Sequence, residues 1–302
     1  MHQPLSGVYA AALTPINQDG TIAVGDLLRL LDFLAGRGCH GALLLGTTGE
    51  GTSFAPDERR AIFTAALGVR QAHPEFHLLA GTGTPSLEET IQLTRLAFNL
   101  GFDGVVVLPP YYYKKVPDDG LLAWYSQVIE RAVPAGGALF GYHFPGISGV
   151  GLSLDLLSRL KDAHPERFAG LKDSSGDPEH ASQIGLRFGE DLLVLTGSDR
   201  LFGHALQNSA GGCITALANL YSPDLRRLWQ AFRDGDGATQ AQAQDRLSAA
   251  RKVLERYPPA PPLLKAMMAR LHGFPEWAVR PPLLPLSAQL ADQADSEFAQ
   301  IG

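Results

Sequence analysis

Residues 168–177 read FAGLKDSSGD, an apolar run that stops at a charged pair followed by small polar residues. Short apolar runs that stop at Gly, Pro, Thr or Asp recur along the first two thirds of the chain. The eight runs are Gly7–Leu13, Gly41–Leu45, His77–Gly81, Gly104–Leu108, Ala138–His143, Phe168–Lys172, Leu192–Thr196 and Gly212–Ala216. Their hydrophobicity is continuous rather than alternating, which is typical of parallel strands buried on both faces.

Amphipathic helical stretches fill most of the intervals between these runs. Clear examples are Val24–Arg37, Pro56–Gln71, Leu87–Leu100, Gly120–Val133 and Leu154–Ala163. The first residues of successive runs are 34, 36, 27, 34, 30, 24 and 20 positions apart, so every interval can hold a crossover helix, the last two only a short one. Strand and helix alternating eight times predicts an α/β fold, the (β/α)8 TIM barrel.

The character of the chain changes after residue 218, where the strand-like runs stop. We expect helices over Asp224–Arg233, Ala238–Arg256, Pro262–Leu271 and Ser287–Ile301, interrupted by proline-rich segments. The predicted organisation is a (β/α)8 barrel over residues 1–218 and a C-terminal helical extension over residues 219–302. The Leu/Ala-rich faces of that extension suit packing on the barrel or on another subunit, and we favour the barrel.

Composition excludes several classes of partner. The 302 residues carry 25 Lys+Arg against 31 Asp+Glu, which gives a net charge of −6, and 45% of them are hydrophobic. Without a basic run we expect neither nucleic acid nor a membrane as partner. The apolar runs are far shorter than the roughly 18 residues that span a bilayer, and residues 1–15 lack the basic start of a secretory signal. We therefore expect a cytoplasmic protein.

The two cysteines, Cys39 and Cys213, are too few for a disulfide framework or a cysteine zinc site. We expect both to be small buried apolar residues.

Reactive residues of such barrels lie at the carboxyl ends of the strands, and Lys172 ends the sixth run. Lysine is rarely buried without a partner, and desolvation favours the neutral amine, a nucleophile for carbonyl groups. The alternative is an ammonium group that pairs with Asp173 or another carboxylate. Position alone favours neither.

Other strand ends offer hydroxyl groups. The run Gly46–Gly51, GTTGEG, has backbone N–H groups and two threonine hydroxyls suited to an anion, or is a turn that caps the next helix. Tyr142 ends the fifth run and Tyr112 follows the fourth, and phenols of this kind either transfer protons or pack. His143 should point to the opposite face from Tyr142, so we interpret it as structural.

With GTTGE, PPYYY, GYHFP and GLKDSSGD placed in that order, the chain resembles the dihydrodipicolinate synthase and N-acetylneuraminate lyase superfamily, class I aldolases that form a Schiff base with pyruvate. The likeness extends over nearly the whole chain, through GVYAAALTP, TGSDRL, GGCITALANL and VRPPLLPL. It implies a homo-oligomer, either a dimer or a tetramer built of dimers, whose substrates are pyruvate and an aldehyde.

The resemblance also implies roles for individual residues. Lys172 matches the imine-forming lysine and Tyr142 the proton-transferring tyrosine. Thr47 and Thr48 match the turn that binds the pyruvate carboxylate, Tyr112 matches a tyrosine lent across a dimer interface to complete a Tyr–Thr–Tyr relay, and Gly197 and Ile214 match residues around pyruvate. Catalysis by these groups implies no metal and no organic cofactor.

One position departs from the synthases of the superfamily. Members that condense pyruvate with aspartate semialdehyde usually carry an arginine two residues after the proline of their YNVP-like motif, where this chain has Ile147. Ile147 cannot hold the second carboxylate, and Arg200 is the nearest candidate to replace that cation. Asp199 would more naturally accept hydroxyl groups from a polyol tail.

We therefore expect a Schiff-base aldolase that reversibly cleaves a 2-oxo-4-hydroxy acid, of the 2-keto-3-deoxy sugar acid or 4-hydroxy-2-oxoglutarate type, to pyruvate and an aldehyde. The alternatives are a 4-hydroxy-tetrahydrodipicolinate synthase and a keto-deoxy sugar acid dehydratase. A barrel that only senses pyruvate or a sugar acid has no need of an amine plus a proton relay. A zinc or magnesium hydrolase lacks a convincing His/Asp cluster at the strand ends.

Overall fold

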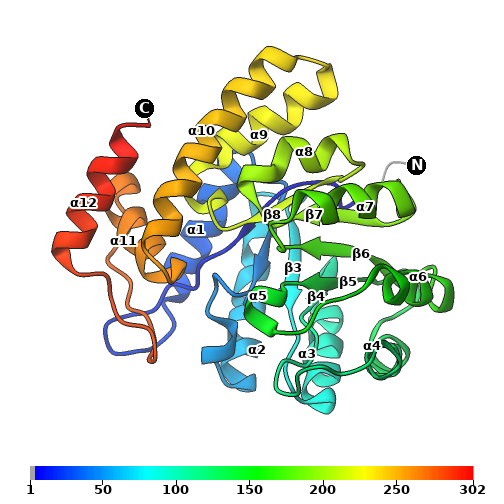
Figure 1. The fold of residues 1–302 in the computed structure, drawn as a ribbon. Helices are drawn as coiled ribbons and strands as arrows, with labels where there is room; N and C mark the ends of the chain where they lie inside the picture. Colours follow the sequence, from blue (N-terminus) through cyan, green and yellow to red (C-terminus); the bar gives the residue numbers. More distant parts are fainter. Residues whose placement is uncertain (1–3, 302) are drawn as a thin grey trace. The chain divides into compact units, whose positions relative to one another are not determined.

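Eight parallel strands close into one barrel in chain order in the computed structural model, which describes residues 4–301 (Figure 1). The strands are β1 Gly7–Ala11, β2 Gly41–Leu44, β3 His77–Gly81, β4 Gly104–Val107, β5 Ala138–His143, β6 Phe168–Asp173, β7 Leu193–Thr196 and β8 Gly212–Thr215. Each lies within two residues of its expected bounds. The predicted (β/α)8 barrel is confirmed.

Helices occupy the intervals between strands. They are α1 Val24–Gly36, α2 Pro56–Ala66, α3 Leu87–Asn99, α4 Asp118–Ala132, α5 Pro145–Ser148, α6 Leu154–Ala163, α7 Pro178–Phe188 and α8 Phe202–Gln207, with the 3-10 helices η1 Gly51–Ser53, η2 Leu67–Gln71 and η3 Asp199–Leu201. The side chains of Ser86, Ser153 and Asp177 cap the starts of α3, α6 and α7, as these residue types commonly do. The helix expected over Pro56–Gln71 is divided into α2 and η2.

Four helices follow the last strand, as expected. They are α9 Ala218–Asp234, α10 Gly237–Arg256, α11 Ala260–His272 and α12 Ala288–Ala299. Figure 1 shows α9 beside α10 and α11 beside α12. Helix α9 begins six residues before the predicted start, because Pro223 kinks it at Tyr221 without ending it. Prolines 261 and 262 lie in the first turn of α11, where a missing N–H costs no helical bond.

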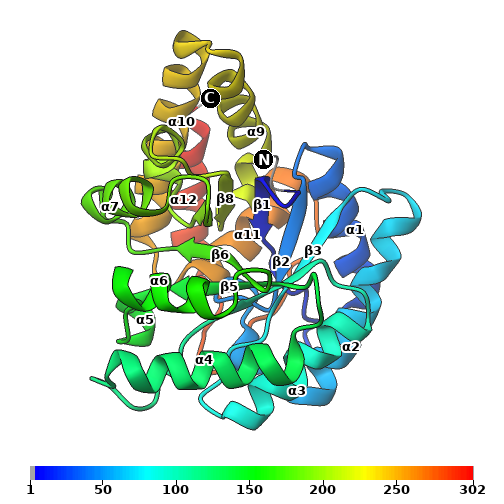
Figure 2. The ribbon, with the colours of Figure 1, turned by 90° about the vertical axis from the view of Figure 1, so that its right-hand side faces the viewer.

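Contacts divide the described chain into two units, residues 4–7 with 77–214 and residues 8–76 with 215–301. The first unit holds β3 to β7, most of β8 and the helices α3 to α8, and within it α3 and α4 lie side by side (Figure 2). The second holds β2, most of β1, and the helices α1, α2 and α9 to α12. The predicted domain boundary at residue 218 stays a prediction. The ends of the two predicted domains, residues 1–3 and 302, lie outside the described residues.

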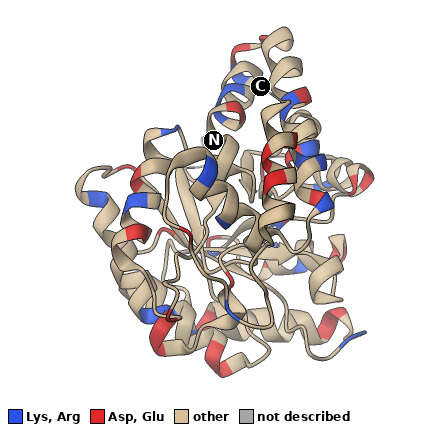
Figure 3. Cartoon of the chain, turned by 90° about the vertical axis from the view of Figure 1, so that its left-hand side faces the viewer, with Lys and Arg blue, Asp and Glu red and all other residues tan. Residues whose placement is uncertain are grey.

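The helices of both units carry mixed charge. Figure 3 shows basic and acidic residues interspersed along them, rather than one sign gathered on one face. Within residues 4–301, no helix has the length and apolar character that crossing a membrane requires.

Both cysteines are buried, as the sequence predicted, with Cys39 6% exposed and Cys213 fully enclosed. Burial raises the pKa of the Cys39 thiol to about 12, so this thiol is a packing residue and a poor nucleophile.

Asn219, in the first turn of α9, forms hydrogen bonds with backbone groups at the end of β1, just after β1 and just before α9. Its amide donates to Ala11 O at 2.9 Å and to Ala216 O at 2.8 Å, and its side-chain oxygen accepts from Leu13 N at 3.2 Å. The residue is fully buried. No water can replace these partners without entering the core.

We expect Asn219→Ala to lower the free energy of unfolding by about 2–4 kcal/mol, because Leu13 N and Ala11 O lose their side-chain partner in the core, while Ala216 O keeps the bond from the backbone N–H of residue 219. Urea unfolding measures this change. Asn219→Asp keeps the acceptor for Leu13 N but turns a carboxylate oxygen towards two buried carbonyl oxygens, so it should lose at least as much as the alanine variant. A loss below about 0.5 kcal/mol for the alanine variant, the range of neutral surface changes, would mean that the tie is not structural.

Candidate active site

Lys172 and Tyr142 lie at the carboxyl ends of two neighbouring strands of the first unit. The register of β5 and β6 pairs Tyr142 with Lys172, and Lys172 Nζ lies 4.1 Å from the centroid of the Tyr142 ring. Both residues are buried, with Tyr142 5% exposed and Lys172 3% exposed. Paired residues on adjacent strands face the same side of the sheet, so the amine and the phenol share one enclosed space.

Among the residues described, Lys172 has neither a carboxylate within 4.0 Å nor a hydrogen-bond partner. Asp173, the neighbour that the sequence offered as an ion-pair partner, faces the other side of β6, where its Oδ1 accepts from Ser175 N at 3.0 Å. The ion-paired alternative therefore does not hold among the described residues, and the nucleophilic role of Lys172 stays a prediction.

Three more of the predicted site residues lie at the ends of β7 and β8. Gly197 N donates to Asp173 O at 2.6 Å, and a Cβ at Gly197 would lie 1.9 Å from Ser174 Oγ, so only glycine allows this approach. Asp199 begins η3 and Ile214 lies in β8, and both are buried. Their contact with a substrate stays a prediction.

Tyr112 lies in the loop after β4 and Ile147 lies in α5, and Lys114 links these two segments. Lys114 Nζ donates to Tyr111 O and, at 2.5 Å, to Ser148 O at the end of α5. Tyr112 is 75% exposed, and its ring packs edge-on against that of Tyr113, with centroids 5.2 Å apart. Ile147, in α5, is 57% exposed. The Tyr112 side chain is thus accessible to another molecule.

Thr47 and Thr48 lie in the second unit, in the turn that follows β2. Thr47 is exposed and Thr48 is 8% exposed. The threonine hydroxyls do not cap the following helices, since Glu50 is the N-cap of η1 and Ala55 that of α2. The capping alternative therefore does not hold.

The turn is tightly wound. Leu45 and Glu50, on either side of it, have positive φ angles of 55°, which non-glycine residues rarely adopt. Glu50 N donates to Thr47 O at 3.2 Å, and Thr14 Oγ1 donates to Gly49 O at 2.7 Å. A Cβ on Gly51 would lie 2.0 Å from Leu45 O, so the turn requires glycine there.

The sequence analysis missed a buried ion pair behind this turn. Lys265, in α11, places Nζ 2.5 Å from Glu50 Oε1, and their side chains are 2% and 0% exposed. Lys265 Nζ also donates to Ala278 O at 2.6 Å, and Arg280 N donates to Glu50 Oε2 at 3.1 Å. A signal was present, because Lys265 interrupts the apolar stretch PPLLKAMM.

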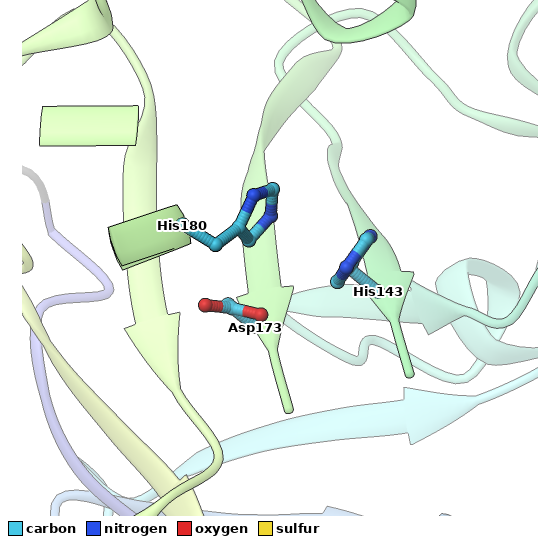
Figure 4. Close-up of side chains that lie close together, drawn as sticks. All are labelled: His143, Asp173 and His180. Atoms are coloured by element: carbon cyan, nitrogen blue, oxygen red, sulfur yellow. The ribbon is translucent and has the colours of Figure 1, made fainter. Parts of the chain in front are cut away.

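His143, Asp173 and His180 form a polar cluster on the other face of β5 and β6 (Figure 4). Each offers one potential ligand atom, and these atoms lie within 4.8 Å of one another. The sequence did not reveal the cluster, because His180 comes from α7. The two imidazole rings are stacked, with centroids 4.4 Å apart.

This cluster is poorly suited to a metal ion. His143 Nδ1 accepts a hydrogen bond from Leu152 N at 2.9 Å, so the neutral ring carries its proton on Nε2. Neither nitrogen then has a lone pair to give, whereas metal-binding histidines normally donate their second N–H. Burial lowers the pKa of His143, while Asp173 opposes and His180 adds to that effect. We interpret His143 as a structural residue, which is also the interpretation that the sequence suggested.

Comparisons with known proteins agree over the whole described chain. The model of the dihydrodipicolinate synthetase family matches residues 4–301. An uncharacterized DapA-like lyase of Chloroflexus aurantiacus is 40% identical over 283 residues, 93% of this chain and 92% of that protein. A 4-hydroxy-tetrahydrodipicolinate synthase of Syntrophobacter fumaroxidans is 30% identical over 291 residues, 93% of either chain.

Solved structures show the same fold. A prophage protein of Escherichia coli K12 from the dihydrodipicolinic acid synthase family, solved in complex with pyruvate, matches with a TM-score of 0.92 and 28% identity over 98% of both chains. The dihydrodipicolinate synthase of Agrobacterium tumefaciens matches with a TM-score of 0.87 and 29% identity over 98% of this chain and 99% of that one.

The bidentate pair of Arg280 and Glu58 should make stability depend on pH in the acid range. Hydrogen bonds from Arg280 at 2.6 and 2.8 Å lower the pKa of Glu58 from 4.5 to about 2. Stability from this pair is fully present above pH 4.5 and is lost as the pH falls through about 2. Because a third of the Glu58 side chain is exposed, we expect Glu58→Gln to lose only about 1 kcal/mol.

The measurement is urea unfolding of both proteins between pH 2 and pH 7. The deficit of Glu58→Gln should be constant near neutrality and should shrink towards pH 2. A deficit that does not change with pH would show that the carboxylate charge makes no contribution.

Proposed function

Because this chain belongs to the dihydrodipicolinate synthetase family, whose members are pyruvate-dependent Schiff-base lyases and synthases, we propose that it reversibly cleaves a 2-oxo-4-hydroxy acid to pyruvate and an aldehyde. The observation that carries this proposal is the buried Lys172, without a carboxylate partner in the described chain and 4.1 Å from the Tyr142 ring centroid. An amine in that setting is suited to attack a carbonyl carbon.

In the proposed mechanism, Lys172 Nζ adds to the C2 carbonyl of the substrate and water leaves to give the imine. A base removes the proton of the C4 hydroxyl, the C3–C4 bond breaks, and its electron pair moves into the imine to form an enamine as the aldehyde departs. Protonation at C3 and hydrolysis then release pyruvate and return the free amine. The imine is the electron sink, so the chemistry needs no metal or organic cofactor.

Tyr142 is the proposed proton carrier, because it is the phenol paired with Lys172 in the strand register. It takes the C4 hydroxyl proton and later helps to protonate the enamine, the work of a general acid and base. We further propose that Thr48 and a Tyr112 from a neighbouring subunit extend the relay. Tyr112 is exposed enough to reach a second chain, and a homo-oligomer, dimer or tetramer, would then be the active form.

The remaining residues are proposed to bind substrate. Thr47 and Thr48 offer backbone N–H groups and hydroxyls to the pyruvate carboxylate. Gly197 and Ile214 line the space around C3, since one leaves room and the other is apolar. Asp199 accepts hydroxyl groups of the distal tail. The cytoplasmic location stays a prediction of the sequence.

A second candidate is 4-hydroxy-tetrahydrodipicolinate synthase, the name carried by several relatives at 28–30% identity. The exposed Ile147 speaks against it, because the synthases need a cation for the second carboxylate of aspartate semialdehyde. A keto-deoxy sugar acid dehydratase would use the same imine and lose water in place of the aldehyde. A barrel that merely senses such acids would bind them without turnover.

The Schiff base is tested by adding borohydride in the presence of pyruvate. We expect reduction to fix pyruvate on Lys172 and to inactivate the enzyme, because a reduced imine cannot hydrolyse. Intact-mass measurement and peptide mapping locate the adduct, and Lys172→Ala is the control that should take none. An active protein whose Lys172 stays unmodified would rule out this mechanism.

Substrate choice is tested by comparing kcat/KM for aspartate semialdehyde and for hydroxylated aldehydes on one preparation. Loss of a charge-assisted hydrogen bond costs roughly 1.5–3 kcal/mol, so Ile147 should disfavour aspartate semialdehyde by about 10- to 150-fold. Ile147→Arg should recover part of that loss. A clear preference of the unaltered enzyme for aspartate semialdehyde would replace the aldolase by the synthase.

A further inference from the structure

We propose that Lys265 and Glu50 are positioning residues that hold the Thr47–Thr48 turn in the shape that accepts the pyruvate carboxylate. This inference rests on the proposed function, since it concerns the same substrate. All the groups involved belong to the second unit: the turn after β2, helix α11 and the segment that follows it. Neither residue is proposed to touch the substrate.

The conformation of the turn needs support from outside it. Its two flanking residues, Leu45 and Glu50, are both in the left-handed region, which persists only where the surroundings impose it. Two backbone hydrogen bonds close the turn, one of 3.2 Å from Glu50 N to Thr47 O and one of 3.1 Å from Gly51 N to Gly46 O. Contacts from outside the turn must therefore supply the rest of the constraint.

Glu50 receives that constraint at both carboxylate oxygens. Lys265 Nζ lies 2.5 Å from Oε1, and Arg280 N donates to Oε2 at 3.1 Å. With both oxygens occupied and the side chain unexposed, Glu50 is neither a base nor a substrate ligand. Its charge fixes the backbone of the last residue of the turn, three positions from Thr47.

The partners of Glu50 are themselves fixed. Lys265 Nζ also donates to Ala278 O at 2.6 Å, and Ala278 N donates to Ile16 O at 2.9 Å. The Arg280 guanidinium donates to Gly20 O and Ser53 O, both at 2.9 Å, besides its pair with Glu58. Helix α11 and the segment after it therefore connect Glu50 to chain segments that lie before and after the turn.

A buried ion pair is an expensive way to obtain stability alone, because apolar residues of similar size usually serve as well or better. The pair also fixes the orientation of the Glu50 carboxylate, because each of its two oxygens has its own donor. A site that recognises a planar carboxylate gains from such preorganisation, and small displacements weaken binding strongly. The pair is therefore interpreted as a device for substrate binding.

The test is Lys265→Met, which keeps the length of the side chain and removes its charge. We measure borohydride trapping of Lys172 against pyruvate concentration, and reductive alkylation of Lys172 by acetone, a ketone without a carboxylate. The half-saturating pyruvate concentration should rise about 10-fold or more, while alkylation by acetone should stay within about twofold of the unaltered protein. General damage to the lysine pocket would change both.

Met268→Ala is the matched control, because it removes fully buried packing from the same helix without touching Glu50. It should lower the melting temperature and leave the half-saturating pyruvate concentration unchanged. If Lys265→Met does not fold, the double variant Glu50→Gln, Lys265→Met leaves no unpaired charge and should show the same rise.

Unchanged half-saturation in whichever of these variants folds would overturn the inference, as would an equal rise in Met268→Ala. The proposed function fails in a different way, by the absence of a pyruvate adduct on Lys172 in the unaltered protein. If neither charge variant folded, the pair would be essential to the fold itself and the positioning role would be abandoned.

Discussion

The register between β5 and β6 is the constraint on which the candidate site depends. Leu139 pairs with Phe168, but the next residue, Phe140, pairs with Gly170, so β6 carries one extra residue at a bulge. Without that bulge Tyr142 would face Leu171. The irregularity brings Tyr142 opposite Lys172 instead, and such re-aiming of side chains is a common use of bulges beside active sites.

The same register determines what lies on the opposite face. Because side chains alternate along a strand, pairing Tyr142 with Lys172 also pairs His143 with Asp173. The polar cluster with His180 is therefore a consequence of the same register, and it lies on the face of β5 and β6 opposite Tyr142 and Lys172. The backbone bond from Leu152 N to His143 Nδ1 uses the imidazole as a fixed acceptor, which suits support of the strand ends better than ligation.

Local patterns in the sequence were sufficient for the barrel and for the positions of Lys172 and Tyr142, because continuous hydrophobicity defines the buried strands and reactive groups follow their ends. Three features were not accessible to such reasoning. The bulge in β6 changes which residues of β5 and β6 are paired but leaves the hydrophobic pattern unchanged. The kink at Tyr221 lets α9 continue through Pro223. Lys265 and Glu50, which form an ion pair, are 215 positions apart in the sequence. Each depends on contacts between distant segments.

The two buried lysines show how one residue type serves two purposes. Burial lowers the pKa of Lys265 and Glu50 opposes that effect, and the Lys265 side chain is committed to its ion pair with Glu50. Lys172 is as deeply buried, yet its neighbour on one side is an aromatic ring and, in the described chain, no carboxylate lies within 4.0 Å. A lysine with its charge paired fixes structure, whereas the absence of a counter-ion beside Lys172 supports the role proposed for it, because an imine with a carbonyl substrate would give that nitrogen a bonding partner that the protein does not supply.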